Sequence, residues 1–280
     1  MQQLHRVYKL SIGSDSQSIV IENLRISFEI IKTIEADPNQ GTFAICNLSP
    51  SNRALITEKK YDRIKFEAGY RDGGLKTLFL GFIDTVENFI EGTDTITNIV
   101  AADGAKDYRE AITSKTIAKG STKKEIVSQI LGDMPETDQG AIDIDNEEKS
   151  IRAKVLFGSC RDVLGKLSTG LDSKWSIQDN ELMVLKNDSA LANDEGFLLS
   201  RETGMIGSPA KNSDGLEVKC YLNNIMKIGQ LCAIESLLPE YSGSYKINKI
   251  TMSGDTHSSE WYSVLIVENG QFKKVEGAKA

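Results

Sequence analysis

The sequence predicts a mainly β fold with a small α+β insert, so the whole chain falls in the α+β class. Apolar and polar residues alternate with a period of two through the first hundred residues, as on half-buried strands. The period becomes helical in the middle of the chain and returns to two in the last third. We therefore expect β-rich parts at 1–105 and 201–280, built as sandwiches or barrels, around an α+β module at 106–200.

The first strands form a hairpin that leads into a helix. Residues 24–30 alternate, which puts four side chains in the core: Leu24, Ile26, Phe28 and Ile30. The turn-forming residues Asp37–Gly41 connect this strand to a return strand in "TFAICNL". Ser49 is then expected to cap a short helix that has Pro50 in its first turn.

More strands follow in the N-terminal part. Residues 64–68 alternate again, whereas 78–83 are apolar on both faces, as in a strand that is covered on two sides. Residues 96–102 form the returning strand. Several short strands separated by regular turn signals are typical of a β-sandwich or a barrel.

The middle module contains two helices and a hairpin. Thr122 and Glu125 have the spacing of a capping box at the start of one helix, and Ser159 and Asp162 have cap spacing at the start of the other. Asp179-Asn180 is the expected turn of a hairpin. The acidic stretch 132–150 is expected to be an exposed connection.

The last third returns to strands. Residues 216–222 alternate, and residues 245–268 form a long hairpin with a polar tip at 253–259. Residues 203–215 are expected to form a loop. Strands from elsewhere in the chain would complete the β-rich part at 201–280.

Composition excludes some classes of function. The net charge of -7 over 280 residues argues against a protein that binds nucleic acid by neutralising phosphates. The N-terminus lacks the apolar core of a secretory signal, and no apolar stretch is long enough to span a bilayer. We therefore expect a soluble chain, made in a cytoplasm, whose four separated cysteines are small buried residues.

No catalytic, cofactor or metal site is expected. Residues 143–148 begin like a calcium loop, but Glu148 stands where glycine is needed and Lys154 where glutamate is needed. The two histidines, His5 and His257, are isolated, and no phosphate-binding or nucleophile-elbow motif is present. A carboxylate pair for glycan hydrolysis stays open among the 40 acidic residues.

Several segments resemble the baseplate hub family of contractile-tailed phages, whose wider group includes the late-control protein D type. The segments with the greatest similarity are "TGMIGSP" at 203–209 and "SGDTHSSEWY" at 253–262. The hairpin ending in "NLSP" is similar to the N-terminal β-domain of the same proteins. The helices and hairpin at 120–185 resemble the family's middle module.

The resemblance implies a structural role rather than an enzymatic one. Hubs of this type form a homotrimeric ring in which each chain carries two tube-like β-domains. The resulting pseudo-sixfold collar would join a hexameric tail tube to a trimeric central spike and would contact other baseplate proteins. DNA would pass through the lumen without specific binding, and the protein, made in the bacterial host's cytoplasm, would reside in the virion's tail baseplate.

Two other readings stay open. One is a related tail-tube-initiating or distal tail protein, or the hub of a secretion-system spike; a remote one is a cell-wall glycan hydrolase. The hub reading needs contact surfaces, and loops supply these more often than cores do. The candidate interface residues lie in three loops: Asp37, Pro38, Asn39, Ser208, Pro209, Gly254, Asp255, Thr256 and His257.

Overall fold

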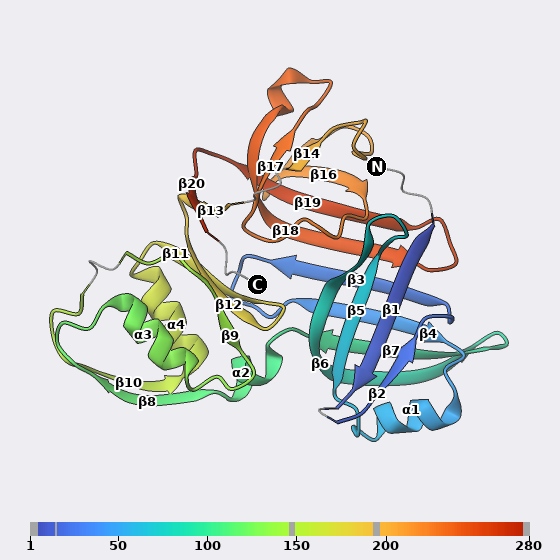
Figure 1. The fold of residues 1–280 in the computed structure, drawn as a ribbon, viewed down its shortest axis with the longest axis horizontal. Helices are drawn as coiled ribbons and strands as arrows, with labels where there is room; N and C mark the ends of the chain where they lie inside the picture. The colour runs from blue at the N-terminus through green and yellow to red at the C-terminus, as the bar shows by residue number, and fades with distance from the viewer. Residues whose placement is uncertain (1–4, 15, 146–148, 193–196, 277–280) are drawn as a thin grey trace.

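A 13-stranded sheet dominates the computed structural model, which describes residues 5–14, 16–145, 149–192 and 197–276 (Figure 1). Its main path runs β15-β16-β19-β18-β3-β4-β7-β6-β5-β1-β2, and β14 and β17 branch from β18. The strands are β1 (Arg6–Gly13), β2 (Ser18–Ile21), β3 (Ile26–Thr33), β4 (Gln40–Cys46), β5 (Arg63–Tyr70), β6 (Gly74–Glu91), β7 (Asp94–Ala102), β14 (Phe197–Leu199), β15 (Ala210–Asn212), β16 (Gly215–Tyr221), β17 (Leu231–Ile234), β18 (Gly243–Asp255) and β19 (Trp261–Asn269).

Three small sheets and the helices complete the fold. The small sheets pair β8 (Ile112–Ile117) with β10 (Lys154–Ser159), β12 (Glu181–Lys186) with both β9 (Asp138–Ile142) and β11 (Ser173–Gln178), and β13 (Ser189–Leu191) with β20 (Lys273–Val275). The helices are α1 (Pro50–Thr57), α2 (Ala105–Glu110), α3 (Lys123–Leu131), α4 (Cys160–Thr169) and the 3-10 turn η1 (Pro239–Tyr241). None of the helices in these described ranges is both long and apolar enough to cross a membrane.

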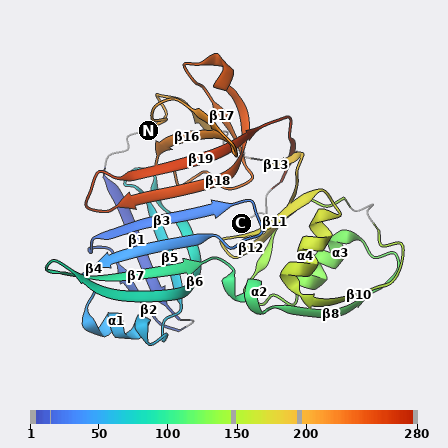
Figure 2. The same cartoon turned by 180° about the vertical axis from the view of Figure 1, so that it is seen from behind.

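The long strand β6 lets the large sheet fold over on itself. Its first half pairs with β5 and its second half with β7, and the register shifts between Ile83 and Thr85. Such an irregularity bends a strand and increases its twist. Figure 1 shows β1 and β5 crossing in front of β3 and β4, and Figure 2 shows the same layers from behind. The space between the layers holds the main core.

The main core joins both ends of the chain. Ile26, Phe28 and Ile30 are buried as predicted, whereas Leu24 precedes β3 and is only half-buried against the same core. The ring of Phe28 contacts that of Phe66 at a centroid distance of 4.6 Å and that of Trp261 at 5.3 Å. In addition, β18 and β3 pair over seven register positions. The N-terminal and C-terminal β-rich parts therefore share one sheet and one core.

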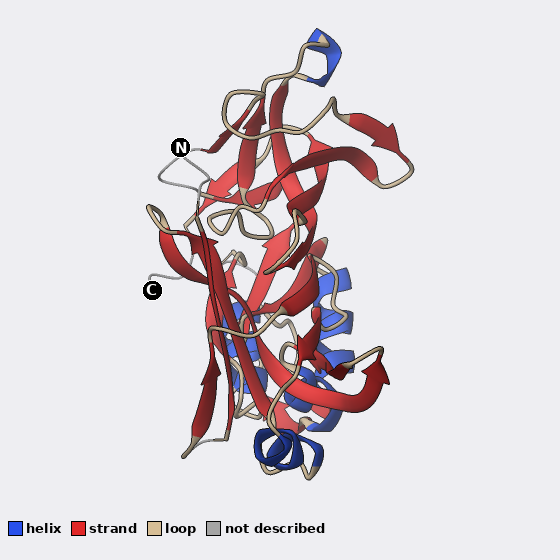
Figure 3. Cartoon of the chain, turned by 90° about the vertical axis from the view of Figure 1, so that its right-hand side faces the viewer, coloured by secondary structure: helices blue, strands red, loops and turns tan. Residues whose placement is uncertain are grey.

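The prediction of a mainly β fold is confirmed (Figure 3). The predicted pair of separate barrels or sandwiches is not seen in this form. The described strands close no barrel, because the sheet's main path ends at two different edge strands, β15 and β2. The boundaries at residues 105 and 200 remain a prediction.

A second core lies inside the middle module, where α3 and α4 pack with the small sheets. The predicted caps are present, because Thr122 and Glu125 form a capping box and the Ser159 hydroxyl accepts from the Asp162 N–H. Asp179 and Asn180 form the predicted turn with φ angles of 54° and 67°. Such left-handed pairs fit the twist of a two-residue hairpin.

Some elements differ from the prediction. The acidic stretch 132–150 is not simply an exposed connection, because it contains β9, which pairs with β12, and the buried residue Ile144. The β3–β4 hairpin is confirmed, although its connection spans 34–39 and Gly41 already belongs to β4. The tip of the last hairpin is shorter than predicted, because β18 continues to Asp255.

Candidate functional site

Two of the three predicted interface loops lie at opposite ends of the large sheet. Strand pairing places the β3–β4 turn, residues 34–39, beside Asn248, whereas the β18–β19 turn, residues 256–260, lies beside Ile26. We call the first the module end, because the β11–β12 hairpin packs there. We call the second the hairpin end. The tip of the β6–β7 hairpin also lies at the hairpin end.

Asn39 at the module end has an internal structural role. Only 2% of the residue is exposed, so Asn39 offers almost no surface to a partner. Its amide donates to the Ile177 carbonyl at 2.9 Å, and its oxygen accepts from the Thr33 N–H at 2.8 Å. These bonds hold the middle module against the β3–β4 turn. In the same turn, Asp37 is exposed and Pro38 is half-buried.

Asp103 is the centre of this contact. It is fully buried and accepts hydrogen bonds from the N–H groups of Asp179 and Asn180. Burial, together with the nearby Asp179 carboxylate, raises the pKa of Asp103 to about 7. The Lys32 ammonium forms an ion pair with Asp179 at 2.6 Å. Sequence reasoning missed this cluster, because its members are far apart in the chain.

The hairpin end is held by polar contacts around Asp255. This carboxylate accepts from the Arg25 guanidinium at 3.0 Å, the Ser27 hydroxyl at 2.8 Å and the His257 N–H at 2.8 Å. Burial alone would raise the pKa of Asp255, but these donors hold it below its ordinary value. Asp255 is only 5% exposed, so it too offers little surface to a partner.

The other predicted residues divide between buried and accessible positions. Gly254 is buried, and a Cβ there would lie 2.7 Å from the Trp261 ring and 2.8 Å from the Phe28 ring, so the packing requires glycine. Thr256 is half-buried and His257 is exposed. Ser208 is exposed and Pro209 is buried. The accessible candidates are therefore Asp37, Ser208 and His257, with partial access at Pro38 and Thr256.

The β6–β7 tip is a feature that the sequence reasoning missed. Phe89 is 47% exposed and Ile90 is 77% exposed, although both residues are large and apolar. They pair with Ile96 and Thr95 just before the turn. The signal in the sequence was "ENFIEG", in which two apolar residues precede a turn glycine.

One face of the large sheet is open. On the side opposite the main core, each strand from β16 to the second half of β6 presents a row of side chains. Most of these side chains are half-exposed. Figure 2 views this face, with β18, β3, β4 and β7 toward the reader and β1 and β5 behind. The residues of the open face are Glu217, Lys219, Tyr221, Tyr262, Val264, Ile266, Lys249, Thr251, Ser253, Glu29, Ile31, Gln40, Thr42, Ala44, Asn98, Val100, Thr85 and Glu87.

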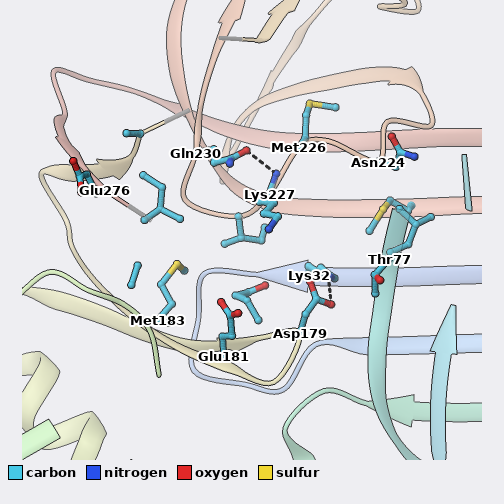
Figure 4. A pocket seen from close by; sticks show the side chains of 18 residues that line it. Lys32, Thr77, Asp179, Glu181, Met183, Asn224, Met226, Lys227, Gln230 and Glu276 are labelled. Atoms are coloured by element: carbon cyan, nitrogen blue, oxygen red, sulfur yellow. Dashed lines mark hydrogen bonds and ion pairs between the residues drawn. The ribbon is translucent and has the colours of Figure 1, made fainter. Parts of the chain in front are cut away.

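A cavity of about 520 Å³ lies where the three parts of the chain meet (Figure 4). Its wall includes the Lys32–Asp179 ion pair and three methionines, Met183, Met226 and Met252. The lining also includes the carboxylates of Glu181 and Glu276. Within the part of the chain that the structure describes, no group of three or more His, Cys, Asp or Glu residues is arranged to hold a metal ion.

Solved structures share this fold over nearly the whole chain. The 43 kDa tail protein of prophage MuSo2 from Shewanella oneidensis matches with a TM-score of 0.66 and 10% identity, over 94% of this chain and 96% of that one. A tail protein from Neisseria meningitidis MC58 matches with a TM-score of 0.60 and 9% identity, over 95% and 98%. The Escherichia coli c3393 protein, a type VI secretion system component, matches with a TM-score of 0.61 and 12% identity, over 95% and 79%.

Sequence comparison identifies the family. No curated protein sequence matches the chain significantly. The family model for the baseplate hub gp41, in contrast, matches residues 7–266, which is almost the whole length. The resemblance to baseplate hubs that the sequence motifs indicated is thereby confirmed, and the chain belongs to the baseplate hub gp41 family.

Proposed function

We propose that the protein is the structural hub of a contractile phage tail and that three copies form a ring around the tail axis. The observation that carries this proposal is the open face, which runs without interruption across strands from both ends of the chain. Turned inward in three copies, this face would make a continuous channel wall. The two β-rich parts of each chain would give the ring its pseudo-sixfold character.

The flanks of the sheet suit contacts between neighbouring copies in such a ring, and its two ends suit the two outside partners. A ring needs heterologous contacts, in which different surfaces of neighbouring copies meet. The sheet offers different flanks for this, β15 and β16 on one side and the β6–β7 hairpin on the other. The module end and the hairpin end would then form the two faces of the collar. One face would meet the hexameric tail tube and the other the trimeric spike.

The side chains of the open face fit the passage of DNA without adhesion. The face carries three glutamates, Glu29, Glu87 and Glu217, against two lysines, Lys219 and Lys249. Most of its other residues are small, uncharged or hydroxyl-bearing. Proteins that hold DNA use clusters of Lys and Arg to neutralise phosphates, and this face has no such cluster.

The decisive experiment is an electron cryo-microscopy map of the assembled tail. We expect three copies of the chain on the axis, with Thr42 and Thr251 facing the channel. Six copies would favour a tube-initiating protein instead. A map with the open face turned outward would contradict the proposed channel wall.

Two other functions have weaker support. The likeness to a type VI secretion component keeps a secretion-spike hub as the second candidate, since both kinds of protein share this fold. A cell-wall hydrolase has no support from the comparisons, because the family model that matches nearly the whole chain is that of a baseplate hub. A purified monomer that cleaves cell-wall glycan would overturn the hub proposal.

A further inference from the structure

The two-stranded ribbon of β8 and β10 has an unusual outer face. Its inner face packs on the second core, where Thr113 and Ile117 are fully buried. The outer face of such an antiparallel pair is normally polar. Here Ile112 is 67% exposed, Val155 73% and Phe157 78%.

These apolar side chains form one stripe. Phe157 pairs with Ser114, and Ile112 pairs with Ser159, so Ile112 and Phe157 are diagonal neighbours across the ribbon. Diagonal neighbours on a sheet lie about 7–8 Å apart, within reach of an aromatic ring. Val155 follows two residues along the same strand and therefore lies on the same face. A contiguous apolar stripe of this kind marks an interaction site more often than single exposed residues do.

Both edges of the ribbon are open to a further strand. Among the described strands, β8 and β10 pair only with each other. Figures 1 and 2 place the ribbon on the outer side of the middle module, away from the large sheet. Free strand edges invite pairing, and proteins usually protect them.

The ribbon and the residues that flank it are basic in an acidic protein. Residues 112–124 and 149–159 contain seven Lys and Arg residues and no acidic residue, although the chain as a whole has a net charge of -7. Lys115 pairs with Asp133 at 2.9 Å. Lys119, Arg152 and Lys154 are exposed and form no ion pair with any residue that the structure describes. The acidic residues that precede 149–159 in the sequence, Glu147 and Glu148, lie outside the described residues.

We propose that the ribbon binds an acidic, extended segment of another protein, which adds to a free edge as a third strand. Strand addition supplies main-chain hydrogen bonds, and the side chains that alternate along the strand supply specificity. Added beside β10, the segment would cover Val155 and Phe157 with its apolar residues, and its carboxylates would face Arg152 and Lys154. The free edges favour a peptide over DNA or lipid, since neither of these forms strand hydrogen bonds. That the segment comes from a neighbouring baseplate protein rests on the proposed function.

Peptide binding to the purified full-length chain tests the proposal. The probe is a fluorescein-labelled nine-residue peptide that alternates Glu and Val, and its anisotropy reports binding. We expect binding that weakens about tenfold in R152E/K154E, since each exposed charge pair contributes modestly. We expect a similar loss in F157S, and no binding of a peptide with Lys in place of Glu.

Matched variants separate the ribbon from general effects of charge and hydrophobicity. K76E/K211E reverses two exposed lysines elsewhere, and L237S removes an apolar residue that is 84% exposed on another surface. Both should bind the acidic peptide as the unchanged protein does. Hydrogen exchange should slow in β8 or β10 when the peptide is added. Absence of acidic-peptide binding, or equal losses in the control variants, would overturn the proposal.

Other occupants have distinct outcomes. Two further probes are a 20-base-pair DNA duplex and vesicles of phosphatidylcholine and phosphatidylglycerol. If one of them binds to the ribbon and the peptide does not, the surface belongs to nucleic acid or membrane, and the proposal is refuted. If the chain self-associates in sedimentation velocity and R152E/K154E abolishes this association, the ribbon binds a second copy of the chain. The proposal is then refuted as well. A tail map with three copies on the axis and a bare ribbon would leave the hub function standing and refute this inference alone.

Discussion

Two of the joints between parts of the chain differ in chemistry. The C-terminal part meets the N-terminal part through the β18–β3 ladder and an apolar contact between Trp261 and Phe28. The middle module meets the same sheet through a buried polar cluster around Asn39 and Asp103. The first joint makes one continuous sheet. The second adds buried hydrogen bonds, whose donors and acceptors are costly to leave unpaired, to apolar contacts of Met183 and Leu185 with the main core.

The largest expected effect is at the apolar joint. Trp261→Ala should lower the free energy of unfolding by about 3–5 kcal/mol, because it removes a fully buried ring from the shared core. Denaturant unfolding measures this change. Trp261→Phe is the matched control and should cost less, since the indole N–H has no hydrogen-bond partner among the described residues. A loss below 1 kcal/mol for the alanine variant would show that the two parts do not depend on this contact.

The next effect is a dependence of stability on pH at the polar joint. The pKa of Asp103 is raised to about 7 in the folded chain, so this group keeps its proton where the unfolded chain has lost it. Stability should therefore fall as pH rises from about 4 to about 7, by ~1.4 kcal/mol for each unit of pKa difference. Unfolding of wild type and Asp103→Asn across this window measures the difference. A difference that is independent of pH would contradict the prediction.

A smaller and more local effect is expected at Asn39. Asn39→Ala leaves the Thr33 N–H and the Ile177 carbonyl without their buried partner, at a cost of about 1–3 kcal/mol. Hydrogen exchange should accelerate in β11 and β12 and stay slow in β18. Asp37→Ala, which removes only an exposed hydrogen bond from the Tyr108 hydroxyl, is the control and should change stability by less than about 0.5 kcal/mol. Faster exchange in β18 would show that the two joints are coupled.

The smallest effect should come from Arg6, which ties the hairpin end from outside. Its guanidinium donates to the carbonyls of Ser258 and Ser259 and lies 5.2 Å from the centre of the Trp261 ring. These contacts are exposed, so Arg6→Ala should cost about 1 kcal/mol or less. Thermal unfolding at low and high salt checks this. A loss as large as that of Trp261→Ala would mean that the apolar joint depends on the turn.

The comparison also explains which features the sequence could predict. Caps and hairpin turns depend on neighbouring residues, so Thr122 with Glu125, and Asp179-Asn180, were identifiable from local spacing. The surroundings of Asn39, in contrast, could not be inferred from its neighbours in the sequence. An Asn beside Pro in a turn normally meets solvent, and its burial depends on Ile177, 138 residues later.

The pairing of β18 with β3 was likewise beyond local patterns. Alternation gives the face of a strand but not its neighbour, so the two β-rich parts looked separable. The open face could not be predicted from local patterns either, because its rows of half-exposed side chains come from strands at both ends of the chain. The ribbon was missed because "ITSKTI" mixes apolar and polar residues without a clear period.

The β18–β3 ladder also has a consequence for the timing of synthesis. Ser27 and Asp255, which pair in the ladder, are 228 residues apart in the chain. At about 5–20 residues per second, roughly 10–45 s separate the translation of the two residues. During that interval the edge of β3 has no partner and is available to other nascent chains. The charged side chains of Glu29 and Lys32 on this strand would then discourage premature association, until the last strands emerge and complete the sheet.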